Sequence, residues 1–584
     1  MRRKNPSRAV PALVRAGVVL AAANIVSPGA LAEVRLTGLE GALLDNALIH
    51  LSLDEEPCDA PEWRVRERFN RAGAEIAAAL EAYGFYAFEV EEQLELGDGC
   101  WQASFDVELG EPVRLREVDV NVRGAAAGDP SFSQFIADSG LVAGEPLRHG
   151  DYEQLKRRLV ELAQRRGYVE AVYEISRVDV YPAAGFADVV MHLDSGPRYA
   201  FGEVAFNQEL LEPALLDSYY EFRRGDPYDR QRLTELYVEL TGSGYFSTVD
   251  VRPQLADREA KEIPVLVTLA GVRRYAISYG LGFSTDTGPR FRFGRVNRRV
   301  NRSGAQSGIN GQLSPVISEI GYNYRFPYGD PRSEWISLDA GLKREETDTA
   351  TSDTLELGAR RVIRRRAGWQ ETRFLDLIIE DFVVADTRSR ARLLTPGISW
   401  LKLEADDALR PAHGYRLGLE ISGANDSLGS DTTFVQVDAT AKWIYSFENQ
   451  SRFLIRGRLG FTSERNFEEL PPSVRFFAGG DNSVRGYEFE SLGPVDADGD
   501  VIGGDRIAVA SVEYDFPFSA SWSGAVFLDV GNAFTGSDFD AKQGAGFGLR
   551  WQSPVGPIRF DIAWPIDDAV EQGARLHVSL GADL

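Results

Sequence analysis

The chain has 584 residues and a formal net charge of −24 at pH 7, with 88 acidic residues against 64 lysines and arginines. This length predicts several domains. A strongly acidic chain repels polyanions, so the composition argues against nucleic acid as a partner.

The first 32 residues have the pattern of a secretory signal. Basic residues open the chain, an apolar run follows over residues 16 to 23, and the segment ends in Ala30-Leu31-Ala32. We therefore expect an exported protein whose mature part begins at Glu33. Beyond this signal no uninterrupted apolar stretch reaches the roughly 20 residues of a membrane helix, so an exported chain of this kind is either soluble or a β-barrel.

Cys58 and Cys100 are the two cysteines of the chain, and both lie early in the expected mature part. An oxidising compartment favours a disulfide between them. The alternative is a pair of buried thiols. A metal site is not expected, because no histidine neighbours either cysteine.

Three repeats follow one another between residues 33 and 271. Each carries an apolar stripe at helical spacing that ends in a glycine and an aromatic residue, at Gly84-Phe85, Gly167-Tyr168 and Gly244-Tyr245. Helices in the second and third repeats have Asp151 and Asp229 as candidate caps. Recurring glycine motifs close the repeats and give the boundaries 33–110, 111–196 and 197–271. The pattern within each repeat is strand, helix, helix, strand, strand.

From residue 272 to 584 the hydrophobic period becomes two. Val435, Val437, Ala439, Ala441 and Trp443 alternate with polar residues, which predicts strands with one apolar face. Such a face is buried between the sheets of a soluble sandwich or exposed to lipid on a membrane barrel. Charges interleaved with apolar residues, at Arg290, Arg292 and Arg295, favour the barrel, because a polar lumen accommodates them.

The segment Gly479-Gly480-Asp481-Asn482-Ser483 runs on into Val484-Arg485-Gly486-Tyr487 and is the most informative motif of the chain. It resembles the sixth-loop signature of the outer-membrane assembly superfamily, in which periplasmic POTRA domains precede a sixteen-stranded barrel. Arg475 to Gly480 and Trp551 to Arg559 are similar to the TamA family, the barrel subunit of the translocation and assembly module. The resemblance covers nearly the whole mature chain and identifies the three repeats as POTRA domains.

An arginine in a barrel lumen needs a carboxylate partner, best held by paired hydrogen bonds. Glu513 and Asp529 match the wall positions at which the family holds the loop arginine. The flanking glycines permit a tight path past the wall, and Tyr487 is expected to pack across the loop. The alternative for Arg485 is an ordinary lumen arginine in a ladder of charges.

Catalytic motifs are not found, and we expect neither an enzyme nor a cofactor. The five histidines are scattered, and the chain has no Gly-x-Ser-x-Gly elbow and no Gly-Lys-Ser or Gly-Lys-Thr phosphate loop. The acidic segment 496–500 imitates the start of a calcium loop but lacks the glycine and the glutamate that such a loop requires. No metal site is therefore expected.

The seam between the first and last barrel strands is the expected working part. The first strand begins near Tyr275 and contains Tyr279 and Gly280, and the last contains Leu576, Val578, Leu580 and Gly581. Where such pairing is short, both edges offer free backbone groups to an incoming strand. Gly581 is poorly suited to a long ladder, which agrees with the lateral gate that the resemblance implies.

The resemblance therefore implies an assembly factor in the outer membrane of a Gram-negative bacterium, with its POTRA domains in the periplasm. Its expected clients are unfolded outer-membrane proteins such as autotransporters, and membrane lipids surround it. Its expected partner is a TamB-like protein anchored in the inner membrane, which the first POTRA domain binds. The alternative is a two-partner secretion pore that exports a soluble protein, although such pores normally carry two POTRA domains and a plug helix.

Overall fold

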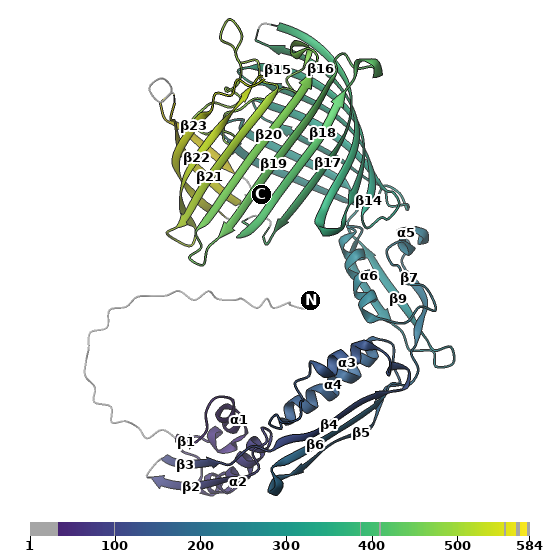
Figure 1. Cartoon of the computed structure of the whole chain (residues 1–584), viewed down its shortest axis with the longest axis vertical. Coiled ribbons are helices and arrows are strands. Elements are labelled where there is room, and N and C mark those ends of the chain that lie inside the picture. The colour runs from purple at the N-terminus through teal and green to yellow at the C-terminus, as the bar shows by residue number, and fades with distance from the viewer. Residues whose placement is uncertain are drawn as a thin grey trace, which may run out of the picture. The chain divides into compact units, whose positions relative to one another are not determined.

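The computed structural model describes residues 33–97, 100–385, 387–407, 410–553, 556–567 and 573–580. The expected signal, residues 1–32, and Gly581 of the expected gate lie outside the described residues. The chain divides between Tyr199 and Ala200 into two compact units, which are described separately. The first contains two small α+β domains, and the second contains a third such domain and a barrel (Figure 1).

The first domain is a three-stranded sheet covered by helices. Its strands lie in the order β1-β3-β2, with β1 parallel to β3. Ile76 and Leu80 on the inner face of the long helix pack against Phe105 of the sheet, and all three are fully buried. A disulfide joins Cys58 and Cys100. The elements are β1 (Glu33–Thr37), α1 (Ala42–His50), η1 (Ser52–Glu55), α2 (Glu62–Glu81), β2 (Phe88–Gly97) and β3 (Cys100–Leu109).

The second and third domains repeat this architecture, so the fold expected from the repeats is confirmed. Their sheets have the orders β4-β6-β5 and β7-β9-β8. The second contains β4 (Arg114–Arg123), η2 (Gly124–Ala126), α3 (Pro130–Ala137), α4 (His149–Arg165), β5 (Val172–Tyr181), η3 (Pro182–Ala184) and β6 (Phe186–Asp194). The third contains β7 (Ala200–Asn207), α5 (Pro213–Asp217), α6 (Arg230–Gly242), β8 (Phe246–Pro253) and β9 (Glu262–Gly271). The expected boundaries near 110, 196 and 271 fall between the sheets or at the end of β9.

The two expected helix caps have different outcomes. Asp229 caps α6, because its carboxylate accepts a hydrogen bond from the amide of Gln231 at 2.9 Å. The expectation for Asp151 is wrong. The helix α4 already begins at His149, so Asp151 lies in its first turn, where a carboxylate is still favourable to the positive end of the helix dipole.

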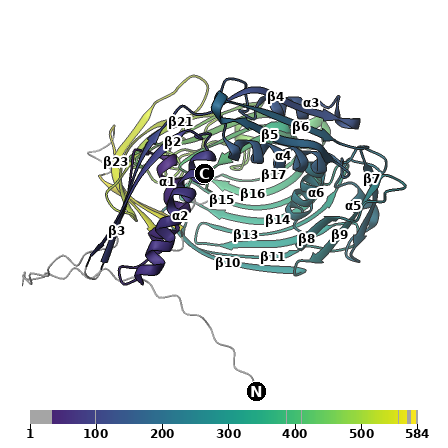
Figure 2. The same ribbon diagram turned by 90° about the horizontal axis from the view of Figure 1, so that it is seen from below.

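Sixteen antiparallel strands close into a barrel, as the resemblance implies. Viewed from below, β10 to β17 follow one another round the wall (Figure 2). Their lengths are uneven, from 6 residues in β25 to 19 in β17. The strands are β10 (Tyr275–Ser284), β11 (Gly288–Asn297), β12 (Gln306–Leu313), β13 (Ile317–Pro327), β14 (Glu334–Glu346), β15 (Ala350–Arg364), β16 (Trp369–Val384), β17 (Thr387–Ala405), β18 (His413–Ala424), β19 (Phe434–Ser446), β20 (Arg452–Glu464), β21 (Arg506–Pro517), β22 (Trp522–Phe534), β23 (Lys542–Ser553), β24 (Gly556–Pro565) and β25 (Arg575–Leu580).

The apolar face of each strand points outward, as alternation predicts for a membrane barrel. On β19, Val435 and Trp443 are about half exposed, whereas Gln436 points inward and donates to the carbonyl of Val474 at 2.7 Å. Among the described residues no helix is long and apolar enough to cross a membrane.

The prediction that Arg290, Arg292 and Arg295 share the polar face of β11 is wrong for Arg295. Arg290 and Arg292 do share the inner face, but Arg295 does not. Its register partner on β10 is Ile277, which is 62% exposed, and its guanidinium lies 4.6 Å from the ring centre of Tyr275. Strict alternation leaves Arg295 on the outer face because it stands an odd number of residues from Arg292.

The third domain is joined to the barrel at the turn between β11 and β12. The hydroxyl of Tyr245 donates to the carbonyl of Gly304 at 2.5 Å, and the amide of Glu212 donates to the carbonyl of Arg302 at 2.9 Å. These contacts lie beside the start of β10, where Tyr275 pairs with Asn297 at the end of β11.

Replacing Cys58 and Cys100 by serine is predicted to destabilise the first domain. The disulfide spans a sequence separation of 42 residues, and its loss relaxes the unfolded chain, which lowers the free energy of unfolding by about 2–4 kcal/mol. Urea-dependent hydrogen exchange of α2 in the intact protein measures this change. A reductant should shift the wild type by the same amount and leave the double variant unchanged; an equal response of both would contradict the prediction.

Candidate functional site in the barrel lumen and at the seam

The long connection between β20 and β21, residues 465–505, folds into the barrel and is called here the lumen loop. Three backbone bridges, Phe476 with Gly504, Ala478 with Leu492 and Val495 with Val501, give it internal structure. Val484 and Tyr487 are fully buried, in one cluster with wall residues of β21 and β22. Tyr487 thus packs inside the loop cluster, and the loop tip is seated against the wall.

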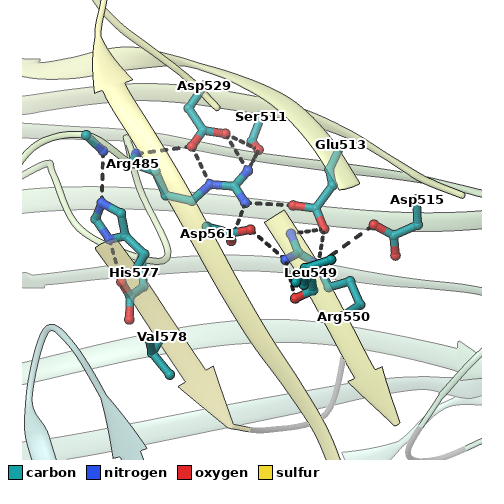
Figure 3. Close-up of polar contacts among 12 residues, drawn as sticks. Arg485, Ser511, Glu513, Asp515, Asp529, Leu549, Arg550, Asp561, His577 and Val578 are labelled. Carbon is teal, nitrogen blue, oxygen red and sulfur yellow. Dashed lines mark hydrogen bonds and ion pairs between the residues drawn. The ribbon is translucent and has the colours of Figure 1, made fainter. Parts of the chain in front are cut away.

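Arg485 is the most heavily bonded side chain of the loop, and its side chain is 3% exposed. Its Nε and Nη2 form a bidentate pair with Asp529 at 2.7 and 3.0 Å, and its backbone amide binds the same carboxylate at 3.1 Å. Its Nη1 donates to Glu513 at 2.6 Å and to Asp561 at 3.1 Å, and its Nη2 donates to Ser511 at 3.4 Å (Figure 3). Three strands of the wall therefore hold one guanidinium.

A second arginine completes this charge cluster. Arg550 on β23 donates to Glu513 at 2.7 Å and to Asp561 at 2.5 Å, so both carboxylates are shared between two guanidinium groups. The ring of Phe527 lies beneath Arg485, with its centre 3.4 Å from Cζ, and adds a cation–π contact. Arg456 links the cluster to the loop backbone through the carbonyl of Ser483 at 2.9 Å.

Two glycines make this close approach possible. Gly486 has a φ of +101°, and a Cβ there would meet the backbone of Trp564 and Pro565 at 2.9 Å. A Cβ on Gly544 of β23 would stand 1.8 Å from the carbonyl oxygen of Arg485. A side chain at either position would push the loop from the wall.

The barrel seam joins β10 to β25, and it is short. Among the described residues a single register pair, Ser284 with Ser579, connects the two strands. The amide of Thr285 adds a bond to the carbonyl of Val578 at 3.1 Å, and Nη2 of Arg290 donates to the carbonyl of Leu580 at 3.2 Å. By contrast β10 pairs with β11 along all 10 of its residues.

The other expected gate residues lie along the two edges. Tyr275, Tyr279 and Gly280 have register partners on β11 but none on β25 within the described residues. The side chains of Tyr279 and Leu576 stand on the outer face, 74% and 58% exposed.

The lumen loop reaches this seam through Asp481. Its carboxylate accepts hydrogen bonds from Ser284 at 2.7 Å, from Thr285 at 2.8 Å and from His577 at 2.7 Å. Nε2 of His577 accepts the amide hydrogen of Gly486 at 2.9 Å, so its proton resides on Nδ1, which faces Asp481. Both ring nitrogens are thereby occupied.

A second carboxylate, Asp286 in the turn after β10, accepts the backbone amide of Asp481 at 2.8 Å. Burial and the neighbouring charge of Asp481 raise the pKa of Asp286 to about 7. Burial also acts against the charge of Asp481, but hydrogen bonds from His577, Ser284 and Thr285 outweigh it and lower the pKa of Asp481. Asp481 is therefore the charged member of the pair. Together with His577 these groups place ligand-type atoms within 4.8 Å of one another.

Glu513 and Asp529 were both expected to hold Arg485, and the structure brings both to it. Sequence reasoning missed Asp561, Arg550 and His577. Asp561 lies in a strand of alternating polar and apolar residues. The alternation predicts that its side chain points into the lumen, but not that it lies level with Arg485. Nothing in the sequence distinguishes His577 from the other four histidines.

Replacing Arg485 by alanine is predicted to release the lumen loop. The change leaves buried carboxylates that Arg550, beside Glu513 and Asp561, and Arg456, beside Asp529, neutralise only in part. Removing one partner of a buried ion pair costs about 3–5 kcal/mol. The barrel should still form, because its ladders are untouched. Protease cleavage within residues 465–505 and the heat-modifiable gel shift measure the two effects. Arg465, 70% exposed in its pair with Asp426, is the matched control, and equal protection in both alanine variants would contradict the prediction.

Comparison with known proteins agrees with this architecture. The Omp85 superfamily domain matches residues 304–583, and the first domain of the TamA POTRA region matches residues 33–109. The outer membrane protein assembly factor BamA of Nitratidesulfovibrio vulgaris is 24% identical over 383 residues, covering 61% of this chain and 48% of that protein. BamA of Neisseria meningitidis serogroup B is 21% identical over 592 residues, covering 88% and 73%. The chain thus spans about half the length of the first relative and about three quarters of the second.

Among solved structures, BamA of Haemophilus ducreyi lacking POTRA domains 1–3 superposes with a TM-score of 0.69 at 16% identity, covering 80% of this chain and 99% of that one. At this identity the likeness shows the fold. Residues 304–583 thus carry an Omp85 superfamily domain and residues 33–109 a POTRA domain of the TamA type, and the protein lies in the outer membrane of a Gram-negative bacterium with its POTRA domains in the periplasm.

Proposed function

We propose that this protein is an assembly factor of the TamA kind, which helps outer-membrane proteins such as autotransporters to insert and fold. The TamA-type first domain and the Val484 to Tyr487 motif in the lumen loop support this assignment. Three POTRA units also favour it over a two-partner secretion pore, which normally carries two.

The observation that carries the proposal is the short seam. Over Tyr275 to Phe283 the edge of β10 that faces β25 has no register partner within the described residues. Free backbone donors and acceptors in a row are a template for another strand. A client strand can therefore pair with β10 beside the lipid, and the next client strand can then pair with the first.

Such assembly needs no catalytic group in this proposal. Burying the apolar outer face of a client barrel in lipid and pairing its backbone groups are both favourable. The protein lowers the barrier by supplying the first strand partner, and the client's own folding free energy drives the reaction.

A TamB-like protein is the proposed periplasmic partner, bound by the first domain. Deleting residues 33–109 should abolish its co-purification from membranes. A variant that lacks the second domain, residues 111–196, and keeps the first is the matched control. Retention of the partner after the first deletion would refute this assignment.

Covalent closure of the seam tests the proposed function. Ser284 and Ser579 are direct partners, and antiparallel partners have the Cα spacing of a disulfide. In proteoliposomes the oxidised Ser284→Cys/Ser579→Cys protein should assemble an unfolded autotransporter barrel no faster than protein-free vesicles do. The gel shift of the folded client measures the rate.

Reduction should restore assembly by the doubly substituted protein. Because a reductant also opens the bond between Cys58 and Cys100, the reduced wild type is measured alongside. The single Ser284→Cys variant is a further control, because it also loses the hydroxyl that binds Asp481. Full-speed assembly by the oxidised double variant would exclude the seam as the working part.

A further inference from the structure

The side chain of Asp481 bridges the two strands of the seam. On the β10 side it accepts from Ser284 and Thr285, and on the β25 side it accepts from His577. Its side chain is 6% exposed. Hydrogen bonds to a buried carboxylate are charge-assisted and about twice as strong as neutral ones. One residue of the lumen loop thus binds both edges of the barrel.

The contacts continue into the backbone of β25. The amide of Val578 donates to Oγ1 of Thr285 at 3.1 Å, and that hydroxyl in turn donates to Asp481. On the other side of the ring, Gly486 of the loop binds His577. The loop therefore binds both ring nitrogens of His577, through Asp481 and Gly486, which lie five positions apart.

The backbone around Asp481 has little freedom to take another conformation. A Cβ on Gly480 would lie 2.8 Å from the carboxylate of Asp286, and the φ of Gly480 is +94°. The backbone of Asp481 is itself held by Asp286. These constraints fix the position of the carboxylate that spans the seam.

The seam has few other bonds with which to stay closed. Within the described residues a single register pair joins its strands, whereas β24 and β25 share six. The ion pair between Arg575 and Glu488 at 2.6 Å is exposed and contributes little. Across the seam there are also the backbone bond from Thr285 to Val578 and the bond from Arg290 to Leu580, so the three bonds of Asp481 are a large part of what holds β25 against β10.

We propose that Asp481 is a latch that keeps the lateral seam closed, and that it acts separately from the arginine anchor at Arg485. The inference rests on the proposed function, since a latch matters only where the seam opens for clients. For the seam to open, Asp481 must lose either its bonds with Ser284 and Thr285 or its bond with His577. The contacts of Arg485 with β21, β22 and β24 need not change, so the loop stays seated while the seam parts.

Substituting Asp481 by asparagine tests the latch, because an amide of the same shape accepts fewer hydrogen bonds and carries no charge. Amide exchange over residues 575–580, in the full-length protein in lipid nanodiscs, should rise at least about tenfold, which corresponds to about 1.4 kcal/mol. Exchange in the β13–β14 hairpin should not change. Thr285→Val, which removes one of the same bonds from the β10 side, should act in the same direction.

The adjacent Asn482 is exposed and provides a control of identical composition. The double variant Asp481→Asn/Asn482→Asp keeps the net charge but moves the carboxylate by one residue, and it should exchange as fast as Asp481→Asn. Wild-type exchange in Asp481→Asn, or in this double variant, would overturn the latch. So would new protease cleavage of the lumen loop in Asp481→Asn, because the seam would then open through loss of the anchor.

Client assembly is measured on the same proteins. Failure of the wild type to speed client folding would refute the proposed function, while the exchange comparison would still decide on the latch. Unchanged exchange together with normal client assembly would refute the latch alone.

Discussion

The burial of one positive charge inside the barrel is the constraint on which the rest of the site depends. A guanidinium removed from water is costly unless carboxylates surround it, and Arg485 meets three of them, on β21, β22 and β24. Since these strands are consecutive in the wall apart from β23, the charge cluster also ties neighbouring strands together. The glycines that line the approach are needed because the loop backbone must come almost into contact with the wall.

From this anchored point the loop extends four residues back to Asp481 and one residue forward to Gly486. Both reach His577 on the last strand. The position of the seam is therefore linked to the anchor through a short piece of backbone, and the two sets of contacts bind different strands. An anchored loop with a separable contact at the seam can remain folded while the barrel opens beside it.

The sequence pattern predicted the strand period and the three repeats, and the resemblance to the assembly superfamily implied the arginine with two of its acidic partners. Alternation gives the face of a residue, as for Gln436 and Val435, but Arg295 shows that charge alone is a poor guide to the face when the spacing is odd. The third partner, Asp561, could not be chosen from the sequence, because its height depends on the register of β24 against β23. The role of His577 depends on the barrel closing, which brings together residues nearly 300 positions apart.

The uneven strand lengths have a consequence for the surrounding lipid. The apolar outer residues of β10 run from Tyr275 to Phe283, which at the usual rise spans about 26 Å along a tilted strand and less along the membrane normal. The opposite wall, around β16 and β17, is much taller. A bilayer thins to match a short hydrophobic wall, so its acyl chains are compressed and less ordered beside β10 and β25. The bilayer is therefore expected to be thinnest beside β10 and β25.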